Sequence, residues 1–464
     1  MKVRLLAAAL VAAALVAVLF AQSGPRGVSL LVTNALVVTM NPAAEVLQRG
    51  AVAIDGTDIV AVGPMADVAG RFRARDTLDA AGQIVLPGLI NTHTHAPMVL
   101  YRGLADDLAL SEWLEKYIFP AEAKTVSPDF VRAGTRLAAL EMIESGTTTY
   151  ADMYYFEEEI ARETRTAGLR GVLGQTIIRF PVADARTPAD GLARAEAFIT
   201  AFKGDALITP AVAPHAIYTV DAGVLRAARE LSRRHNVPTL IHLAETQDEA
   251  RNSEAEFKLS PVRYLDSLGF LGPGVLAAHG VWVSEPEIAL LQARGVGVSH
   301  NPESNMKLAS GTAPVPAYLR ADTAIGLGTD GAASNNDLDM FEAMRMASLL
   351  HKLQSGDPRA VSARAALEMA TIRGARALGL SAQIGSLEPG KRADVILVDV
   401  SGARQTPMYD PVSHLVYVAR GGDVSTTIVN GRVLMRDRRV LTLNEAEVLR
   451  DARAWADKVR AAVH

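Results

Sequence analysis

The chain has 464 residues, a net charge of −4 and no cysteine. Hydrophobic residues make up 49% of it and charged residues 21%, a balance typical of a folded globular protein with more than one domain. The charge gives no reason to expect a nucleic-acid partner, and the lack of cysteine excludes disulfides, cysteine nucleophiles and cysteine-based metal sites. Any metal must therefore be held by His, Asp or Glu.

Residues 1–24 are predicted to lie outside the fold. Lys2 and Arg4 precede an apolar run over residues 5–21, and Ala21-Gln22-Ser23 follows with small residues at the positions that a signal peptidase reads. The run is slightly shorter than the ~20 residues of a spanning helix, so it indicates a secretory signal or, if uncleaved, a membrane anchor. We expect an exported protein, periplasmic or anchored in the inner membrane; a start codon further downstream would leave it cytoplasmic.

The next part of the chain has β character. Runs rich in Val, Ile and Leu predict short strands over residues 28–39 and 52–62, with Asp55-Gly56 as a turn within the second. A further apolar run from Ile84 ends in His93 and His95. We expect residues 27–87 to form the first part of a small β-sandwich.

From about residue 100, amphipathic helical segments alternate with short apolar strands. Strands are predicted at 147–153, 171–178, 207–213, 238–244, 275–278, 296–299 and 323–328, and helices at 132–145, 157–167, 191–202, 222–235, 261–268, 285–293 and 339–353. Repeated βα units imply a parallel sheet, and roughly eight of them predict a closed (β/α)₈ barrel. We place this barrel over residues 88–384.

The C-terminal part returns to β character after a helix predicted at 366–378. A strand is predicted at the end of 385–399, and a hairpin joins 426–430 to 432–435 across Asn430-Gly431, a strong turn signal. We expect residues 385–440 to complete the sandwich that flanks the barrel. An amphipathic helix is predicted over 444–462, within a C-terminal segment of residues 441–464.

The two histidines at the end of the first barrel strand point to metal chemistry. Residues two apart in a strand point to the same side, so His93 and His95 aim at one place. His242 and Asp330 also follow apolar strands, and the active site of such barrels lies at these carboxyl ends. Any one of these histidines alone is more often a hydrogen-bonded structural residue. Together, His93, His95, His242 and Asp330 predict a catalytic zinc site, although iron accepts the same ligands.

Two more residues belong near this metal. Glu245 lies just past His242, where its carboxylate can take and return protons. His279 follows another strand and can orient a water molecule. A bound metal lowers the pKa of its water towards ~7, and Asp330 can accept the proton that this water loses.

Six motifs then resemble one known family, the amidohydrolase superfamily. Within it they most resemble the 5-methylthioadenosine/S-adenosylhomocysteine deaminases, which are related to the triazine chlorohydrolases. The motifs are Asn91-Thr-His-Thr-His-Ala-Pro-Met98, Pro214-His-Ala-Ile-Tyr218, Ile241-His-Leu-Ala-Glu-Thr246, Ala277-Ala-His-Gly280, Ser299-His-Asn-Pro-Glu-Ser-Asn305 and Gly328-Thr-Asp-Gly-Ala-Ala-Ser-Asn-Asn336. The resemblance covers nearly the whole chain after residue 24.

The resemblance implies a barrel with one zinc ion, a flanking β-sandwich, and hydrolytic deamination of adenosine-type nucleosides to the inosine analogue and ammonia. It implies the same four metal ligands, Glu245 as the proton-transferring glutamate, and His279 as the histidine that holds the hydrolytic water. It also implies that Glu122 binds ribose and that His215, Glu245 and Asp330 contact the substrate. Expected partners are therefore a small nucleoside and, through the exposed faces of the barrel, a second copy of the chain.

One feature departs from the family pattern. Members that bind the homocysteine carboxylate use arginines on the loops after the third strand, but Gln175 stands where one is expected, with Arg179, Arg186 and Arg194 nearby. The sequence thus supports a simpler adenosine as substrate more strongly than S-adenosylhomocysteine. The alternatives are a guanine or cytosine deaminase, a triazine chlorohydrolase and, more remotely, a non-catalytic binding protein on the same barrel.

Overall fold

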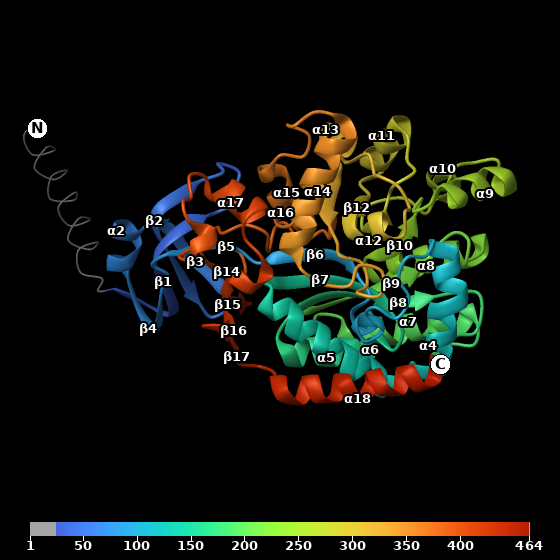
Figure 1. Ribbon diagram of the computed structural model, residues 1–464, viewed down its shortest axis with the longest axis horizontal. Coiled ribbons are helices and arrows are strands. Elements are labelled where there is room, and N and C mark those ends of the chain that lie inside the picture. Colours follow the sequence, from blue (N-terminus) through green and yellow to red (C-terminus); the bar gives the residue numbers. More distant parts are fainter. Residues whose placement is uncertain (1–24, 464) are drawn as a thin grey trace, which may run out of the picture.

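The structure, a computed structural model, describes residues 25–463, so the predicted signal or anchor lies outside the described residues. An eight-stranded parallel barrel, surrounded by helices, stands beside a nine-stranded sheet (Figure 1). Between residues 25 and 463, no helix combines the length and the apolar character that crossing a membrane requires.

The barrel strands follow one another in sequence order around the sheet, from β6 to β13. They are β6 (Leu89–Thr94), β7 (Thr147–Tyr154), β8 (Arg170–Ile177), β9 (Ile208–Pro214), β10 (Thr239–Leu243), β11 (Val275–His279), β12 (Gly297–His300) and β13 (Ala324–Leu327). Neighbouring strands pair in parallel, which confirms the predicted (β/α)₈ barrel.

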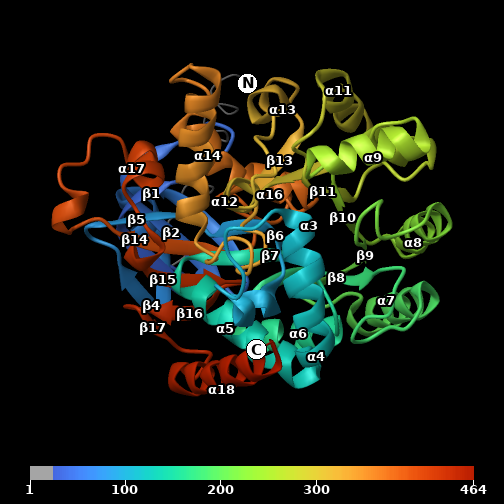
Figure 2. The same cartoon turned by 45° about the vertical axis from the view of Figure 1, so that its right-hand side comes forward.

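Helices follow the barrel strands, and most of them lie on the outside of the barrel (Figure 2). They are α5 (Pro128–Glu144), α6 (Glu157–Ala167), α7 (Pro188–Phe202), α8 (Ala222–His235), α9 (Gln247–Phe257), α10 (Pro261–Ser267), α11 (Glu285–Arg294), α12 (Pro302–Lys307), α13 (Val315–Arg320), α14 (Met340–Ser355), α15 (Ala363–Met369) and α16 (Ile372–Ala377). Side chains of Ser127, Thr187 and Asp221 accept a backbone N–H at the starts of α5, α7 and α8. These caps fix where each helix begins.

Polar contacts close the barrel between its first and last strands. The Thr92 hydroxyl donates to the Leu327 carbonyl over 2.9 Å, and the Asp330 N–H donates to the His93 carbonyl over 2.9 Å. At the opposite, amino-terminal end, α16 packs against β6, β12 and β13, and Gly297 and Gly326 let its backbone approach closely. The barrel is therefore plugged at one end and open at the end where the predicted ligands lie.

The prediction of a single helix over 366–378 is wrong, because the chain forms two helices there, α15 and α16. The Ala370 carbonyl accepts the Ile90 N–H of β6 over 2.9 Å, and the next residue, Thr371, leaves helical geometry (φ −133°, ψ −103°). The turn between the helices carries the chain under the barrel. This long-range contact has no counterpart in the local helical pattern of the sequence.

The second sheet combines strands from both ends of the described chain, as predicted. They form one continuous sheet: β1 (Arg26–Val38), β2 (Val46–Asp55), β3 (Asp58–Pro64), β4 (Phe72–Asp79) and β5 (Gln83–Pro87), with β14 (Val395–Asp399), β15 (Val424–Val429), β16 (Arg432–Arg436) and β17 (Arg439–Val440). Antiparallel pairing of β5 with β14 joins the two halves. Strand β4 was not predicted, because only Phe72 and Leu78 of its eight residues are buried and the sequence there lacks a strand-like apolar pattern.

Helix α18 (Glu445–Val463) follows this sheet and packs against α5. Its Trp455 ring meets the ring of Phe130 edge to face, with centroids 5.4 Å apart. The helix predicted over 444–462 is thus present, and Figure 1 shows it along the lower edge of the barrel.

A buried ion pair connects the sheet to the barrel. Arg170, at the start of β8, donates from Nε and Nη2 to the two oxygens of Asp394, over 3.0 and 3.2 Å. Asp394 Oδ1 also accepts the Asn430 N–H over 2.7 Å. Both side chains are almost fully buried (6% and 3% exposed), so each charge depends on the other for compensation.

We predict that Asp394→Ala destabilises the protein by about 3–5 kcal/mol, because it leaves the Arg170 guanidinium buried without a counter-charge. The half-exposed surface pair between Arg436 and Asp76 provides the control, and Asp76→Ala there should cost less than about 1 kcal/mol. Thermal and urea unfolding of both variants measures the difference. Equal stability of the two variants would contradict the role assigned to this ion pair.

Candidate metal centre and active site

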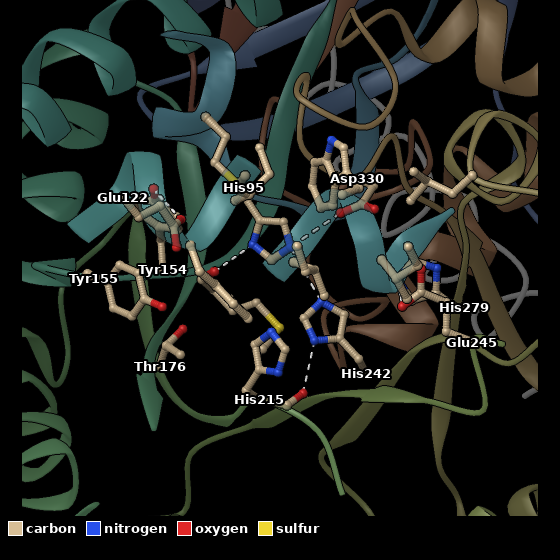
Figure 3. A pocket seen from close by; sticks show the side chains of 18 of the residues that line it. His95, Glu122, Tyr154, Tyr155, Thr176, His215, His242, Glu245, His279 and Asp330 are labelled. Atoms are coloured by element: carbon tan, nitrogen blue, oxygen red, sulfur yellow. Dashed lines mark hydrogen bonds and ion pairs between the residues drawn. The ribbon is translucent and has the colours of Figure 1, made fainter. Parts of the chain in front are cut away.

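A pocket opens at the carboxyl ends of the barrel strands and contains most of the predicted site residues. His95, Glu122, His215, Glu245 and Asp330 all line it (Figure 3). Aromatic and aliphatic side chains form much of the remaining wall, among them Trp113, Ile118, Tyr154 and Leu308. Such a pocket, mostly apolar with a few convergent polar groups, is typical of a small-molecule site.

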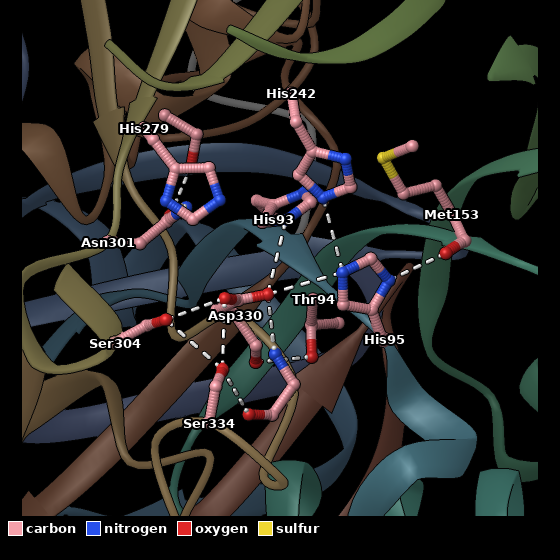
Figure 4. A network of polar contacts seen from close by, with 12 residues as sticks. His93, Thr94, His95, Met153, His242, His279, Asn301, Ser304, Asp330 and Ser334 are labelled. Carbon is pink, nitrogen blue, oxygen red and sulfur yellow. Dashed lines mark hydrogen bonds and ion pairs between the residues drawn. The ribbon is translucent and has the colours of Figure 1, made fainter. Parts of the chain in front are cut away.

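The predicted metal ligands meet beside this pocket. Asp330 Oδ1 lies 3.3 Å from Nε2 of His93 and 3.3 Å from Nε2 of His95. His242 Nε2 lies 3.4 Å from His95 Nε2. Potential ligand atoms of His93, His95 and Asp330 lie within 4.8 Å of one another, and so do those of His93, His242 and His279. Figure 4 shows these side chains around one point.

Hydrogen bonds to the backbone orient two of these rings. His95 Nδ1 lies 2.6 Å from the Met153 carbonyl, and His242 Nδ1 lies 2.9 Å from the His215 carbonyl. A carbonyl can only accept, so each Nδ1 carries the hydrogen and Nε2 is left to face the centre of the cluster. Outer contacts of this kind are usual for metal-ligating histidines.

Asp330 is held by its own set of donors. Its Oδ2 accepts the hydroxyls of Ser304 and Ser334 over 2.7 and 3.0 Å, and its Oδ1 accepts the Gly331 N–H over 2.8 Å. The Asp330 backbone has φ +60°. A non-glycine residue in the left-handed region is strained, and strain of this kind is often found at functional sites.

The residues present fit a divalent metal. Nε2 of His93 is buried and has no hydrogen-bond partner among the described residues. Three imidazoles and one carboxylate form a donor set that suits zinc or iron. Burial lowers the pKa of His93 to about 4. Burial is also the largest single influence on His95, but the hydrogen bond and charge of Asp330, the charge of Asp152 and the Met153 carbonyl together outweigh it and raise the pKa to about 9. The cluster thus favours a positive charge at its centre.

Glu245 and His279 lie together next to this cluster, and the separation between Glu245 Oε2 and His279 Nε2 is 3.7 Å. His279 Nδ1 lies 2.9 Å from Asn305 Oδ1, which holds the ring in place. Burial raises the pKa of Glu245, although the charge of His279 lowers it. A carboxyl group with a raised pKa in a pocket is a suitable proton carrier near neutral pH.

Glu249 supports Glu245 and was not among the predicted site residues. Its two oxygens accept the N–H groups of Ala244 and Glu245, over 3.0 and 2.8 Å. Burial raises the pKa of Glu249 to about 7. The sequence offers only an acidic residue in the first turn of α9 as a signal, and this pattern is common at helix starts.

Glu122 lies on the opposite side of the pocket from Glu245 (Figure 3). It belongs to α4 (Phe119–Thr125), which follows α3 (Leu110–Glu112) and a π-helical turn, η3 (Trp113–Ile118). The Tyr154 hydroxyl donates to Glu122 over 2.7 Å. Burial raises the pKa of Glu122 to about 7. A second hydrogen-bonding group, Tyr154, therefore belongs to this end of the site, although it was not among the predicted site residues.

His215 follows β9 and also faces the pocket. Its ring lies beside that of His242, with centroids 4.7 Å apart, and its Nδ1 lies 2.9 Å from the Thr219 hydroxyl. Burial lowers the pKa of His215 to about 3, so the ring is neutral. The structure thus brings all eight predicted site residues to this end of the barrel.

The segment after β8 provides no free arginine to the inner pocket. Gln175 is buried and donates to Asp184 over 2.9 Å, and Arg194 donates to the same carboxylate over 3.1 Å. Arg179 is exposed and lines an outer vestibule of the pocket. Neither Arg186 nor Arg194 lines the inner pocket.

Comparisons with known proteins agree with this geometry. The amidohydrolase family model matches residues 84–434. The chain belongs to the amidohydrolase family. It is accordingly a hydrolase that acts on carbon–nitrogen bonds, and the predicted resemblance is confirmed.

Three similar proteins cover almost the whole described chain. A 5-methylthioadenosine/S-adenosylhomocysteine deaminase of Syntrophobacter fumaroxidans is 47% identical over 94% of this chain and 100% of its own length. A 5′-deoxyadenosine deaminase of Methanosarcina mazei is 45% identical over 94% of this chain and 99% of its own. The crystal structure of an adenosine deaminase from Xanthomonas campestris with bound zinc has a TM-score of 0.93 and 40% identity, covering 94% of this chain and 100% of that one.

We predict that His242→Ala lowers the bound metal from about one ion per chain to well below half, because it removes one nitrogen ligand and leaves the others in place. His235→Ala is the matched control, since His235 ends α8 and pairs with the half-exposed Glu196, away from the cluster. Elemental analysis after dialysis measures both variants. Full metal content in His242→Ala would show that this histidine is not a ligand.

Proposed function

We propose that the chain is a zinc-dependent deaminase of adenosine-type nucleosides and releases ammonia and the inosine analogue. The main support is the arrangement of Glu122 and Glu245 on opposite sides of one largely apolar pocket, with the histidine cluster next to Glu245. A flat purine suits the apolar walls, a ribose can donate hydroxyl hydrogens to Glu122, and the reacting carbon would face Glu245. The names of the relatives support the same substrate class.

His93, His95, His242 and Asp330 are proposed to hold the zinc. When bound, zinc supplies a Lewis acid that lowers the pKa of a coordinated water towards ~7. Asp330, beside this position, would accept the proton of the attacking water. His279 Nε2 would hydrogen-bond to the same water and hold it against C6 of the adenine ring.

Glu245 would donate a proton to the ring nitrogen beside C6 as the water oxygen adds to that carbon. Its raised pKa favours a carboxyl group that still carries this proton. Breakage of the bond between C6 and the exocyclic nitrogen then releases ammonia, after the proton held by Asp330 has passed to the departing amine. As the C6 carbonyl of the product forms, its hydroxyl proton returns to the Glu245 carboxylate, which restores the carboxyl group. His215 would contact the purine from the side of His242.

The first test is a substrate panel with the purified, zinc-loaded protein. We expect ammonia release from adenosine, methylthioadenosine and 5′-deoxyadenosine, and little from guanine or cytosine. A chlorotriazine, assayed by chloride release, tests the alternative dechlorination. Turnover of guanine, cytosine or the triazine without turnover of any adenosine would overturn the proposed substrate class.

We predict that Glu245→Gln lowers kcat by at least about 100-fold, because the amide cannot deliver a proton to the ring. Zinc content should stay at the wild-type value, since Glu245 is not proposed as a ligand. Ammonia release and elemental analysis on the same preparation separate the two effects. A near-normal kcat in this variant would refute the proton-transfer role.

We predict that Glu122→Gln lowers kcat/KM for adenosine by about 10-fold or more, because a charged hydrogen bond to the ribose is replaced by a neutral one. The same variant should deaminate 2′,3′-dideoxyadenosine as well as the wild type does, since that compound lacks the ribose hydroxyls. An equal loss for both compounds would mean that Glu122 serves the pocket structurally and does not bind ribose.

A further inference from the structure

A groove leaves the pocket beside Glu122, and most of its surface is apolar. Besides Glu122 it is lined by Phe119, Tyr155, Phe180, Pro181, Val182 and Ala183, with the small side chain of Ala123 at its edge. Glu122 and Tyr155 line both the groove and the inner pocket, so the groove extends the pocket beyond the proposed ribose end. The rings of Phe119 and Phe180 meet edge to face, with centroids 5.3 Å apart.

The charged residues behind this groove compensate one another. Asp184 accepts hydrogen bonds from Gln175, Arg194 and the Phe156 N–H, over 2.9, 3.1 and 2.8 Å. Arg194 also donates twice to Glu158, over 2.7 and 2.9 Å. Its guanidinium is thus engaged by two carboxylates and is not available to a ligand. The Asp184 side chain is fully buried (0% exposed). Its hydrogen bonds therefore anchor the segment that carries Phe180 and Val182.

The other opening of the pocket has a different character. An outer vestibule, reached past Leu114 and Tyr218, contains Arg179 and Arg251. Arg251 pairs with Asp248, whereas Arg179 has no ion-pair partner within residues 25–463. Arg179 lines the vestibule but not the groove. Phe119 and Phe180 line both openings and therefore lie between them.

We infer that the groove binds a neutral, apolar substituent at the 5′ position of the nucleoside and selects against a substituent that carries a carboxylate. The inference rests on the proposed function. An alkyl or thioether group would bury its surface against Phe119, Phe180 and Val182. A carboxylate there would lose its water without meeting a cation and would approach the Glu122 carboxylate. Phe180 and Val182 are thus specificity-determining residues of the deaminase.

The test compares kcat/KM of the zinc-loaded full chain for four substrates: adenosine, methylthioadenosine, 5′-deoxy-5′-(butylthio)adenosine and S-adenosylhomocysteine. The butylthio compound matches the tail length of S-adenosylhomocysteine without its charges, so the pair isolates charge from size. We expect kcat/KM for both alkylthio compounds to exceed that for S-adenosylhomocysteine by about 10-fold or more. A kcat/KM for S-adenosylhomocysteine equal to or above that for the butylthio compound would overturn the inference and leave the proposed function intact. If none of the four compounds were deaminated, the proposed function itself would be overturned.

Two variants locate the tail. Val182→Arg should raise kcat/KM for S-adenosylhomocysteine relative to the butylthio compound by about 10-fold, because it adds a cation to the groove. Arg179→Gln is the matched control and should leave this ratio unchanged, since Arg179 faces the vestibule. A selective loss of S-adenosylhomocysteine turnover in Arg179→Gln would place the tail in the vestibule and contradict the inference. Zinc content and the unfolding midpoint of each variant establish that it is folded.

Discussion

The site depends on ring nitrogens that face one another across a buried space, so a positive charge, either a proton or a metal ion, is favoured among them. His95 and His242 each use Nδ1 on a backbone carbonyl, and their Nε2 atoms lie 3.4 Å apart. Lone pairs that meet in a buried space repel unless a cation lies between them. The barrel enforces this arrangement because each histidine is fixed at the end of a strand. The metal that the cluster favours would relieve a repulsion that the fold itself creates.

The contacts that close the barrel also hold the first and last of the predicted ligands in place. Asn91 exchanges hydrogen bonds with Thr329, whose N–H reaches Asn91 Oδ1 over 3.1 Å and whose hydroxyl accepts from Asn91 Nδ2 over 2.7 Å. These two residues precede His93 and Asp330, and the Asp330 N–H reaches the His93 carbonyl directly. The last ligand in the sequence is thus fixed relative to the first across more than half of the chain. Loss of these contacts would open the barrel at the metal centre.

The metal end of the site could be predicted from the sequence because its signals are local. His93 and His95 are two apart after an apolar run, and Asp330 follows a strand within a glycine-flanked turn, so strand periodicity alone places them at one end of the barrel. Tyr154 acts through Glu122, a residue distant in the sequence, and nothing near Tyr154 marks it. Glu249 has nearby partners, but an acidic residue in the first turn of a helix is too common a pattern to single it out. The division of the predicted helix into α15 and α16 could not be predicted either, because the Ala370 carbonyl at the end of α15 binds the N–H of Ile90 in β6, which is distant in the sequence. The periodicity of apolar residues in a sequence does not reveal hydrogen bonds between distant segments.

The two ends of the pocket are built from different kinds of structure. His279 ends β11, and Glu245 follows β10 by two residues. The Ala244 and Glu245 N–H groups there bind the Glu249 carboxylate. Glu122 and Phe180, by contrast, lie on α4 and on the loop after β8. A substitution on that helix or loop changes the shape and charge that meet the tail of a substrate without moving a strand. Reaction chemistry is therefore tied to the barrel, whereas selectivity among nucleosides is free to vary at its rim.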